Sequence, residues 1–413
     1  MNAFSWVFLA ALAAATLTRW WLARRQIEHV RANRDAVPPI FAETIPLDAH
    51  RKAADYTVAK TRLGILDLFL DGIVILAFTL GGGLDLLSSA WGRAFEAGSL
   101  VHGTALLFSL FLIQAAIGLP FSIYRTFGIE QRFGFNRMTW QLYLTDLAKQ
   151  TLLAVVLGLP IILALLWLMQ HMGSLWWLYA WLVLTAFSIV LQLLFPAVIL
   201  PLFNKFTPLA DGELSQRVAK LLERCGFKSK GLYVMDGSKR SSHGNAFFAG
   251  FGAAKRIVLF DTLVDRLDPP EVEAVLAHEL GHYKLRHILK RIVLSTLTTL
   301  AGLWVLGQVM HETWFFAGLS VSQQGMAAAL ALFLLVVPQF TYFLHPVSSH
   351  FSRKHEFEAD AYATNNADAA QLAQALVKLY RDNASTLTPD PLHSAFYDSH
   401  PPAAVRIARL RTT

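Results

Sequence analysis

Long apolar stretches constrain this chain more than any other feature of its sequence. Seven of them approach the length of about 20 residues that a helix needs to cross the hydrocarbon layer of a bilayer. These are residues 4–22, 66–87, 104–124, 152–169, 175–200, 292–310 and 327–344. Only 16% of the 413 residues are charged, whereas soluble domains average about 25%. The sequence therefore predicts a mainly α, multi-pass membrane protein with seven transmembrane helices.

Basic residues alternate between the connections that join these stretches. The first, third and fifth connections and the C-terminal segment are rich in Arg and Lys, whereas the second contains only Arg93 and the fourth and sixth contain none. Because basic loops stay in the cytoplasm, seven helices place the N-terminus outside and the long polar segments inside. No Lys or Arg precedes the first stretch, as a signal peptide would require, so we expect a retained anchor. The Ala-, Leu- and Arg-rich composition favours a bacterial inner membrane, or the endoplasmic reticulum membrane in a eukaryote.

Two polar segments are long enough to fold outside the lipid, and they divide the chain into four parts. Residues 1–200 carry the first five helices with their loops, and residues 288–345 carry the last two. Residues 201–287 begin with a loop and an amphipathic helix, after which GLYVMDG and AKRIVLFDTLV are typical of short strands. Residues 346–413 are typical of two or three helices. We expect a small cytoplasmic α+β cap on a helical membrane body.

Charge and cysteine content exclude two other classes of protein. The net charge is +7, but the basic residues are scattered instead of forming a stripe, so no nucleic acid partner is expected. The single cysteine, Cys225, excludes an intrachain disulfide. We expect it to be a small buried hydrophobic residue.

The segment AVLAHELGHYKLRH carries the arrangement that points most directly to chemistry. Asp268 as a cap, two prolines in the first turn and Val and Leu at helical spacing predict a helix here. His278 and His282 then share one face, and their ring nitrogens can bind one zinc ion. Glu279 projects beside the metal, where a general base takes a proton from the attacking water. Two histidines on the surface of a soluble helix are the ordinary alternative, which the apolar, helical setting disfavours.

A catalytic zinc site needs a third protein ligand and one open position. The segment SSHFSRKHEFEADAYATNNA, which follows the last apolar stretch, is acidic and helical, and Glu356 and Asp360 share a face of it. We assign Glu356 to the zinc, and Asp360 to a hydrogen bond that fixes the tautomer of a ligand histidine. Glu358 points away from both. His355 is turned about 100° around the helix from Glu356, so it is a weaker candidate.

These two segments, together with LFNKFTPL, RSSHGNAFFAGFGAAKRIVLFDTLV and SHPPAAVRI, resemble the type I CAAX prenyl endopeptidases. That family consists of multi-pass zinc metallopeptidases related to the HtpX-type quality-control proteases. The resemblance covers nearly the whole chain, and it implies seven helices around a large intramembrane chamber that is capped at its cytoplasmic end. It implies one Zn²⁺ held by His278, His282 and Glu356, with Glu279 as the base. The implied activity is removal of the last three residues after the prenylated cysteine of a membrane-associated peptide or protein substrate.

Three further residues enter through the resemblance alone. Asn245, in HGNAFFAG, would lie beside an edge strand that pairs with extended substrate. His400 and Arg406 would stabilise the oxyanion that forms when water attacks the scissile carbonyl. Without the resemblance, His400 would be part of a helix N-terminus with prolines in its first turn, and Arg406 a solvated charge. The chain reads EFEAD where the eukaryotic enzymes commonly read Glu-Phe-Gln-Ala-Asp, so Glu358 adds a negative charge near the site.

Two other functions remain open at this level. A quality-control protease would share the zinc site but cut damaged membrane proteins that carry no prenyl group. A transporter or scaffold would use the metal structurally, and polar residues within the apolar stretches would then mark a permeation path; these residues are Asp67, Asp71, Gln114 and Gln192. A structural zinc site is closed by a fourth ligand and is usually rich in cysteine, which disfavours this last alternative. The sequence does not specify the oligomeric state.

Overall fold

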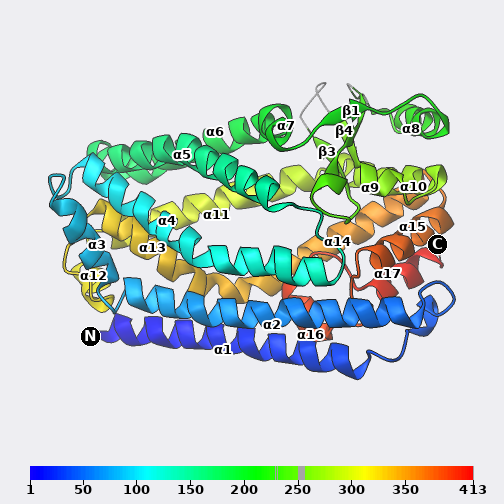
Figure 1. The fold of residues 1–413 in the computed structure, drawn as a ribbon. Coiled ribbons are helices and arrows are strands. Elements are labelled where there is room, and N and C mark those ends of the chain that lie inside the picture. The colour runs from blue at the N-terminus through cyan, green and yellow to red at the C-terminus, as the bar shows by residue number, and fades with distance from the viewer. Residues whose placement is uncertain (228, 230, 250–255, 413) are drawn as a thin grey trace.

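Long helices make up most of the molecule and run side by side along its length (Figure 1). A computed structural model describes residues 1–227, 229, 231–249 and 256–412. The long helices are α1 (Ala3–Ala32), α2 (Leu47–Phe78), α4 (Leu100–Ile123), α5 (Trp140–His171), α6 (Trp176–Leu194), α11 (His287–Val309) and α13 (Met326–Thr341). Among the described residues, six helical segments are long and apolar enough to cross a membrane, or seven if one bent pair is counted as a single span. The predicted multi-pass helical fold is confirmed.

The second predicted span is bent, although its apolar sequence predicts one continuous helix. α2 is followed by the short helix α3 (Gly83–Gly92), and the two form an angle of 55°. Gly82, at the break, has a φ of +74°, where a side chain would be strained. A Cβ on Gly81 or Gly83 would lie 2.9 or 2.7 Å from the carbonyl oxygen of Ala77. Three consecutive glycines therefore allow the chain to turn sharply inside an apolar stretch.

The connections between the long helices gather at two opposite ends of the body. At one end the N-terminus, α3 and the short helix α12 (Thr313–Gly318) lie together (Figure 1). The side-chain amide of Asn2 donates to the carbonyl of Trp314 at 2.8 Å, and a carboxylate oxygen of Asp85 accepts from the backbone N–H of Ser322 at 2.8 Å. The N-terminus and the second and sixth connections, which the sequence assigns to one side of the membrane, thus meet at the same end.

A small sheet belongs to the cap at the opposite end (Figure 1). Within the described residues its strands have the order β1-β2-β4-β3, with β2 and β4 parallel and the outer pairs antiparallel. The strands are β1 (Phe206–Pro208), β2 (Leu232–Met235), β3 (Ala246–Ala249) and β4 (Arg256–Phe260). The sequence pattern predicted strands at β2 and β4, but it predicted a loop at the segment that forms β1. β3 forms one edge of the sheet, as the resemblance implies for the strand beside Asn245; the GFGAAK stretch that follows it lies outside the described residues.

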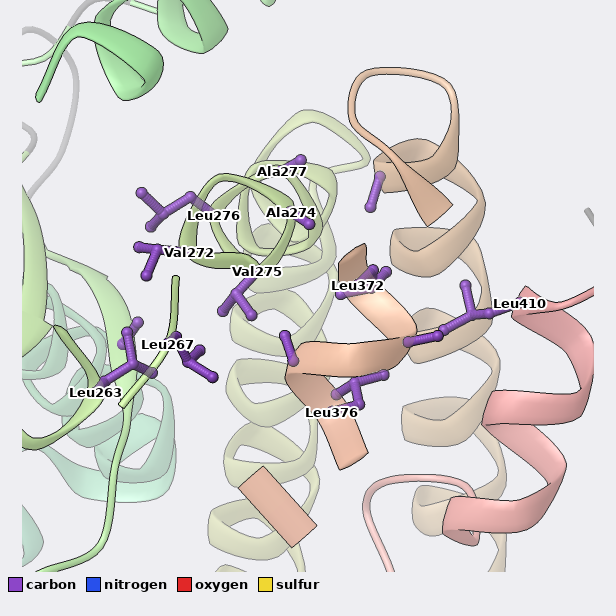
Figure 2. Close-up of a cluster of buried hydrophobic side chains, with 14 of the residues drawn as sticks. Leu263, Leu267, Val272, Ala274, Val275, Leu276, Ala277, Leu372, Leu376 and Leu410 are labelled. Atoms are coloured by element: carbon purple, nitrogen blue, oxygen red, sulfur yellow. The ribbon is translucent and has the colours of Figure 1, made fainter. Parts of the chain in front are cut away.

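Short helices complete the cap and enclose an apolar core (Figure 2). The helices around this core are α8 (Glu213–Arg224), α9 (Asp261–Val264), α10 (Pro269–Lys284), α14 (His345–Thr364), α15 (Ala369–Asp382) and α17 (Ala403–Leu410). Two further short helices lie outside it: α7 (Leu200–Phe203) follows α6, and α16 (Pro391–Tyr397) packs against α14 and α1. α10 begins after Asp268, as predicted, and the Asp268 backbone N–H donates to a Glu271 carboxylate oxygen at 2.8 Å. Val272 and Leu276 of α10 are fully buried in this core, where each apolar side chain contributes about 1.5–3 kcal/mol. Cys225 is buried, as expected.

α14 connects the membrane body to the cap. The long helices have their own apolar core, separate from that of the cap. α13 leads through a short 3₁₀ turn, Tyr342–Leu344, directly into α14, which packs along α10. The second half of α14, which carries Glu356 and Asp360, therefore lies beside the helix that carries the two histidines.

Candidate active site

The site forms where α10 and α14 approach each other closely. Gly281 lies between the two histidines in the sequence, and a Cβ at this position would be 2.9 Å from the Cα of Ala359 and 3.0 Å from its carbonyl oxygen. Real Cβ atoms do not approach backbone atoms this closely. Glycine is therefore the residue that lets the backbones of the two helices come into contact here.

The structure brings together the three residues that the sequence assigned to a metal. One potential ligand atom from each of His278, His282 and Glu356 lies within 4.8 Å of the others. The Nε2 atoms of the two histidines are 3.2 Å apart. The two carboxylate oxygens of Glu356 lie 3.5 Å from Nε2 of His278 and 3.2 Å from Nε2 of His282. Both histidines thus turn the same nitrogen toward one carboxylate.

The chemistry of this group fits a divalent cation. His278 and Glu356 are buried, at 6% and 5% exposed. The Oε2 atom of Glu356 has no hydrogen-bond partner among the described residues, and such a buried acceptor costs about 1–3 kcal/mol if it stays unpaired. Two imidazoles and one carboxylate form a donor set typical of catalytic zinc. The residues present therefore fit a metal that the three of them would hold.

Asp360 and Arg406 form the support behind His278. Nδ1 of His278 lies 2.8 Å from Oδ1 of Asp360. Arg406 donates to both oxygens of the same carboxylate, at 2.7 and 2.6 Å, and its third nitrogen is 3.4 Å from Glu356. Burial lowers the pKa of Arg406, but the carboxylates of Asp360 and Glu356 together raise it by more, so the guanidinium stays charged. The alternative of a solvated charge is wrong for Arg406, since only 4% of it is exposed.

His282 has a different support, His287, which was not among the residues predicted from the sequence. Its Nδ1 lies 3.1 Å from Nδ1 of His287, whose Nε2 lies 2.9 Å from a Glu358 oxygen. Arg286, with a φ of +59°, turns the chain between α10 and α11 and places His287 at the start of α11. The only indication in the sequence was the histidine five residues after His282, in HYKLRH.

Glu279 and His400 lie on the more open side of the site. Glu279 is half-buried next to the two histidines, and burial raises the pKa of its carboxyl group. A cation at the metal position would act in the opposite direction, because positive charge favours the carboxylate. The His400 side chain is 61% exposed, and its Nε2 is 3.5 Å from Oε1 of Glu356. His400 thus reaches the site from the segment that precedes α17.

Two family descriptions match the chain in succession. Residues 26–205 match "CAAX prenyl protease N-terminal, five membrane helices", and residues 208–413 match "Peptidase family M48". The chain belongs to peptidase family M48. The resemblance drawn from its motifs is confirmed, and the protein is a multi-pass membrane metallopeptidase.

Relatives of this M48 peptidase match over most of their length. The CAAX prenyl protease 1 homolog of Arabidopsis thaliana is 38% identical over 75% of this chain and 73% of its own. CAAX prenyl protease 1 of Saccharomyces cerevisiae is 32% identical over 93% of this chain and 90% of its own, and the human homolog is 31% identical over 98% and 95%. The crystal structure of S. mikatae Ste24p matches with a TM-score of 0.91 and 31% identity, covering 99% of both chains. The fold is therefore shared throughout.

Asn245 lies in this M48 peptidase at the entrance of the edge strand. It is exposed and directly precedes β3. Its side-chain oxygen accepts from the N–H of Ala246 at 2.9 Å, and its carbonyl oxygen accepts from the N–H of Phe260 at 3.0 Å. These contacts fix the start of β3, while the side chain remains accessible.

Proposed function

We propose that the protein is a zinc-dependent endopeptidase that removes the last three residues from prenylated, CAAX-type substrates. The observation that carries this proposal is the convergence of His278, His282 and Glu356 from α10 and α14 on one buried point. The relatives that match the chain over most of its length are named CAAX prenyl proteases, which supports the substrate class.

The zinc ion would be held by His278, His282 and Glu356. When bound, it supplies Lewis acidity, which makes water a stronger nucleophile near neutral pH and polarises the scissile carbonyl. Asp360 accepts a hydrogen bond from Nδ1 of His278, which leaves the Nε2 lone pair of that ring free for the metal. Arg406 holds Asp360 through both of its oxygens, so it acts as a positioning residue.

The remaining groups handle the proton and the developing negative charge. Glu279 takes a proton from the attacking water and delivers it to the amine that leaves when the C–N bond breaks. His400, exposed and near Glu356, donates a hydrogen bond to the oxyanion of the scissile carbonyl. The resemblance assigns this second role to Arg406 as well. Because two of its nitrogens already bind Asp360, we propose that the charge of Arg406 contributes from behind Glu356.

The substrate would bind as an added strand. Among the described strands β3 lies at an edge of the sheet, and an extended peptide can pair with such an edge through main-chain hydrogen bonds. Asn245, exposed at the start of β3, would contact the peptide there. The alternation of basic connections supports a cytoplasmic cap, and the prenyl group would then lie in or near the bilayer.

Two of the acidic residues within α2 support a hydrated cavity in the membrane body. Asp67 and Asp71 line a pocket together with Arg19 and Lys60. Charged side chains inside spans face bundle interiors or water in preference to lipid. This placement supports the chamber that the resemblance implies.

The test compares two peptides of one CAAX sequence, with and without a farnesyl group. We expect the purified protein to cleave the farnesylated peptide, a metal chelator to abolish cleavage, and Glu279→Gln to lower kcat by at least about 100-fold, the scale of a general base. Zinc content near one per chain should persist in Glu279→Gln, since Glu279 is not a proposed ligand. Equal cleavage of both peptides would instead favour a quality-control protease, and activity in metal-free protein would contradict the zinc mechanism.

A further inference from the structure

The two histidines of the proposed zinc site have unlike partners on their outer nitrogens. Nδ1 of His278 meets a carboxylate, Asp360, at 2.8 Å. Nδ1 of His282 meets another imidazole, His287, at 3.1 Å. That imidazole in turn meets the carboxylate of Glu358 through Nε2 at 2.9 Å. The path from His282 to a carboxylate is therefore longer by one histidine.

Metal binding at His282 determines which nitrogen of each histidine ring along this path carries the proton. A histidine that gives the Nε2 lone pair to a metal is neutral and carries its proton on Nδ1. Nδ1–H of His282 must then donate to Nδ1 of His287, which has to be unprotonated. The proton of the neutral His287 ring therefore sits on Nε2, where it donates to Glu358. Each hydrogen-bonding atom along the path then has the right partner.

We propose that His287 and Glu358 form a positioning relay that fixes the tautomer and ring orientation of His282 for the metal. This inference rests on the zinc site proposed above. Neutral imidazole bound to a carboxylate is a better acceptor than water because the carboxylate polarises it. Asp360 fixes the ring of His278 by direct contact. For His282 the same effect passes through His287 to Glu358.

The surroundings of His287 suit a fixed ring. His287 is only 4% exposed, so water does not compete for its nitrogens. The ring of His355 stacks on it, with centroids 4.1 Å apart and planes within 15°. Glu358 lies on α14, the helix that also carries Glu356. The relay therefore links both metal-bearing helices through a second set of contacts.

A second metal site is the competing interpretation of the same residues. His287, His355 and Glu358 each offer a ligand atom, and these atoms lie within 4.8 Å of one another. The ring geometry and the proton positions both disfavour a second metal ion here. The stacked rings are nearly parallel, so their in-plane lone pairs do not converge on one ion. Metal at His282 also places the His287 proton on Nε2, the nitrogen that faces Glu358.

The experiment measures zinc affinity in the full-length protein, stripped of metal in detergent and titrated against a competing chelator. We expect His287→Ala to weaken zinc binding by about 10- to 100-fold, the range for partners of metal ligands. His287→Asn, which can place an amide oxygen where Nδ1 lies, should recover most of that loss. Glu358→Ala should weaken binding in the same direction. His355→Phe keeps a stacking ring without nitrogens and should leave zinc affinity unchanged.

The outcomes separate the relay from the site on which it rests. Wild-type zinc affinity in His287→Ala, with binding abolished in Glu356→Ala, would overturn the relay alone. Zinc binding that persists in Glu356→Ala would overturn the proposed zinc site. Two zinc ions per wild-type chain, reduced to one in His355→Phe, would establish the second metal site in place of the relay. A thermal unfolding midpoint of metal-free His287→Asn equal to that of metal-free wild type confirms that folding is intact.

Discussion

Arg406 illustrates what a single buried charge does in this protein. Its guanidinium is 4% exposed and donates twice to Asp360, which itself contacts His278. A charge removed from water is tolerated only when paired and hydrogen-bonded. The pair therefore matters most when one partner is lost, since the other then remains buried and uncompensated.

We expect Arg406→Met to destabilise the protein by about 3–5 kcal/mol, the cost of breaking a buried ion pair. Zinc affinity should fall as well, because Asp360 is no longer fixed behind His278. Arg409→Gln on the same helix is the matched control: Arg409 is exposed and lies over the Phe357 ring at 4.7 Å, worth about 0.5–1 kcal/mol. Thermal unfolding and chelator competition measure both effects. If Arg406→Met lowers kcat but keeps wild-type zinc affinity, the role of Arg406 is to stabilise the oxyanion and not to position Asp360.

The sequence predicted the residues of this site to the extent that their arrangement is local. His278, Glu279 and His282 follow from helical spacing alone, since four residues make about one turn. Glu356 required pairing two distant segments, which composition suggested and the family resemblance supported. His287 was not found because its contact with His282 depends on the turn at Arg286 between α10 and α11, and helical spacing does not extend across such a turn.

At the scale of the element, the contact between α10 and α14 depends on one missing side chain. We expect Gly281→Ala to force the helices apart at Ala359, which costs about 1–3 kcal/mol and weakens zinc binding because α14 carries Glu356. Gly158→Ala in α5 is the control, since a Cβ there meets nothing within 4 Å. Alanine is favoured over glycine by about 0.5–1 kcal/mol inside a helix, so this variant should be neutral or more stable. Equal zinc affinity in the two variants would contradict the close approach.

Glycines also explain where the predicted spans and the observed helices differ. Apolar length identified the second span but carried no information on its shape, and the helix ends near the glycines at 81–83.

The strand β1 was not predicted because its sequence carries no local strand pattern. It is three residues long and ends in Pro208, and its pairing with β2 comes from distant residues instead of a local pattern. Hydrophobic patterning thus predicted which elements exist, and backbone contacts determined their limits.

At the scale of the whole molecule, the first helix is tied to the last part of the chain. Arg25 of α1 donates to both oxygens of Asp390, at 3.3 and 2.9 Å. Gln26 accepts the backbone N–H of Asp390 at 2.7 Å. Asp390 also caps α16 by accepting from the N–H of His393 at 2.9 Å. The segment that leads to His400 is therefore anchored to the membrane body at its start.

This tie gives a pH dependence with a definite sign. Burial raises the pKa of Asp390, but Arg25, the His393 N–H and nearby His29 lower it by more, so it lies below its usual value. A depressed pKa contributes stability above the unfolded value, about 3.9, and that stability is lost as the pH falls through the folded pKa. Asparagine also caps helices, so Asp390→Asn removes mainly the charge. We expect the free energy of unfolding at pH 7 to fall by about 1.5 kcal/mol, with a lower unfolding midpoint, since Arg25 is partly exposed.

The difference between wild type and Asp390→Asn should stay constant from pH 7 to about pH 5, where the carboxyl is ionised in both folded and unfolded chains. It should shrink below about pH 4, because protonation then removes the same charge from the wild type. Thermal unfolding in detergent at matched pH values measures the difference directly. If the stability difference between the two proteins is the same at pH 3 as at pH 7, the contact between α16 and α1 does not depend on the charge of Asp390.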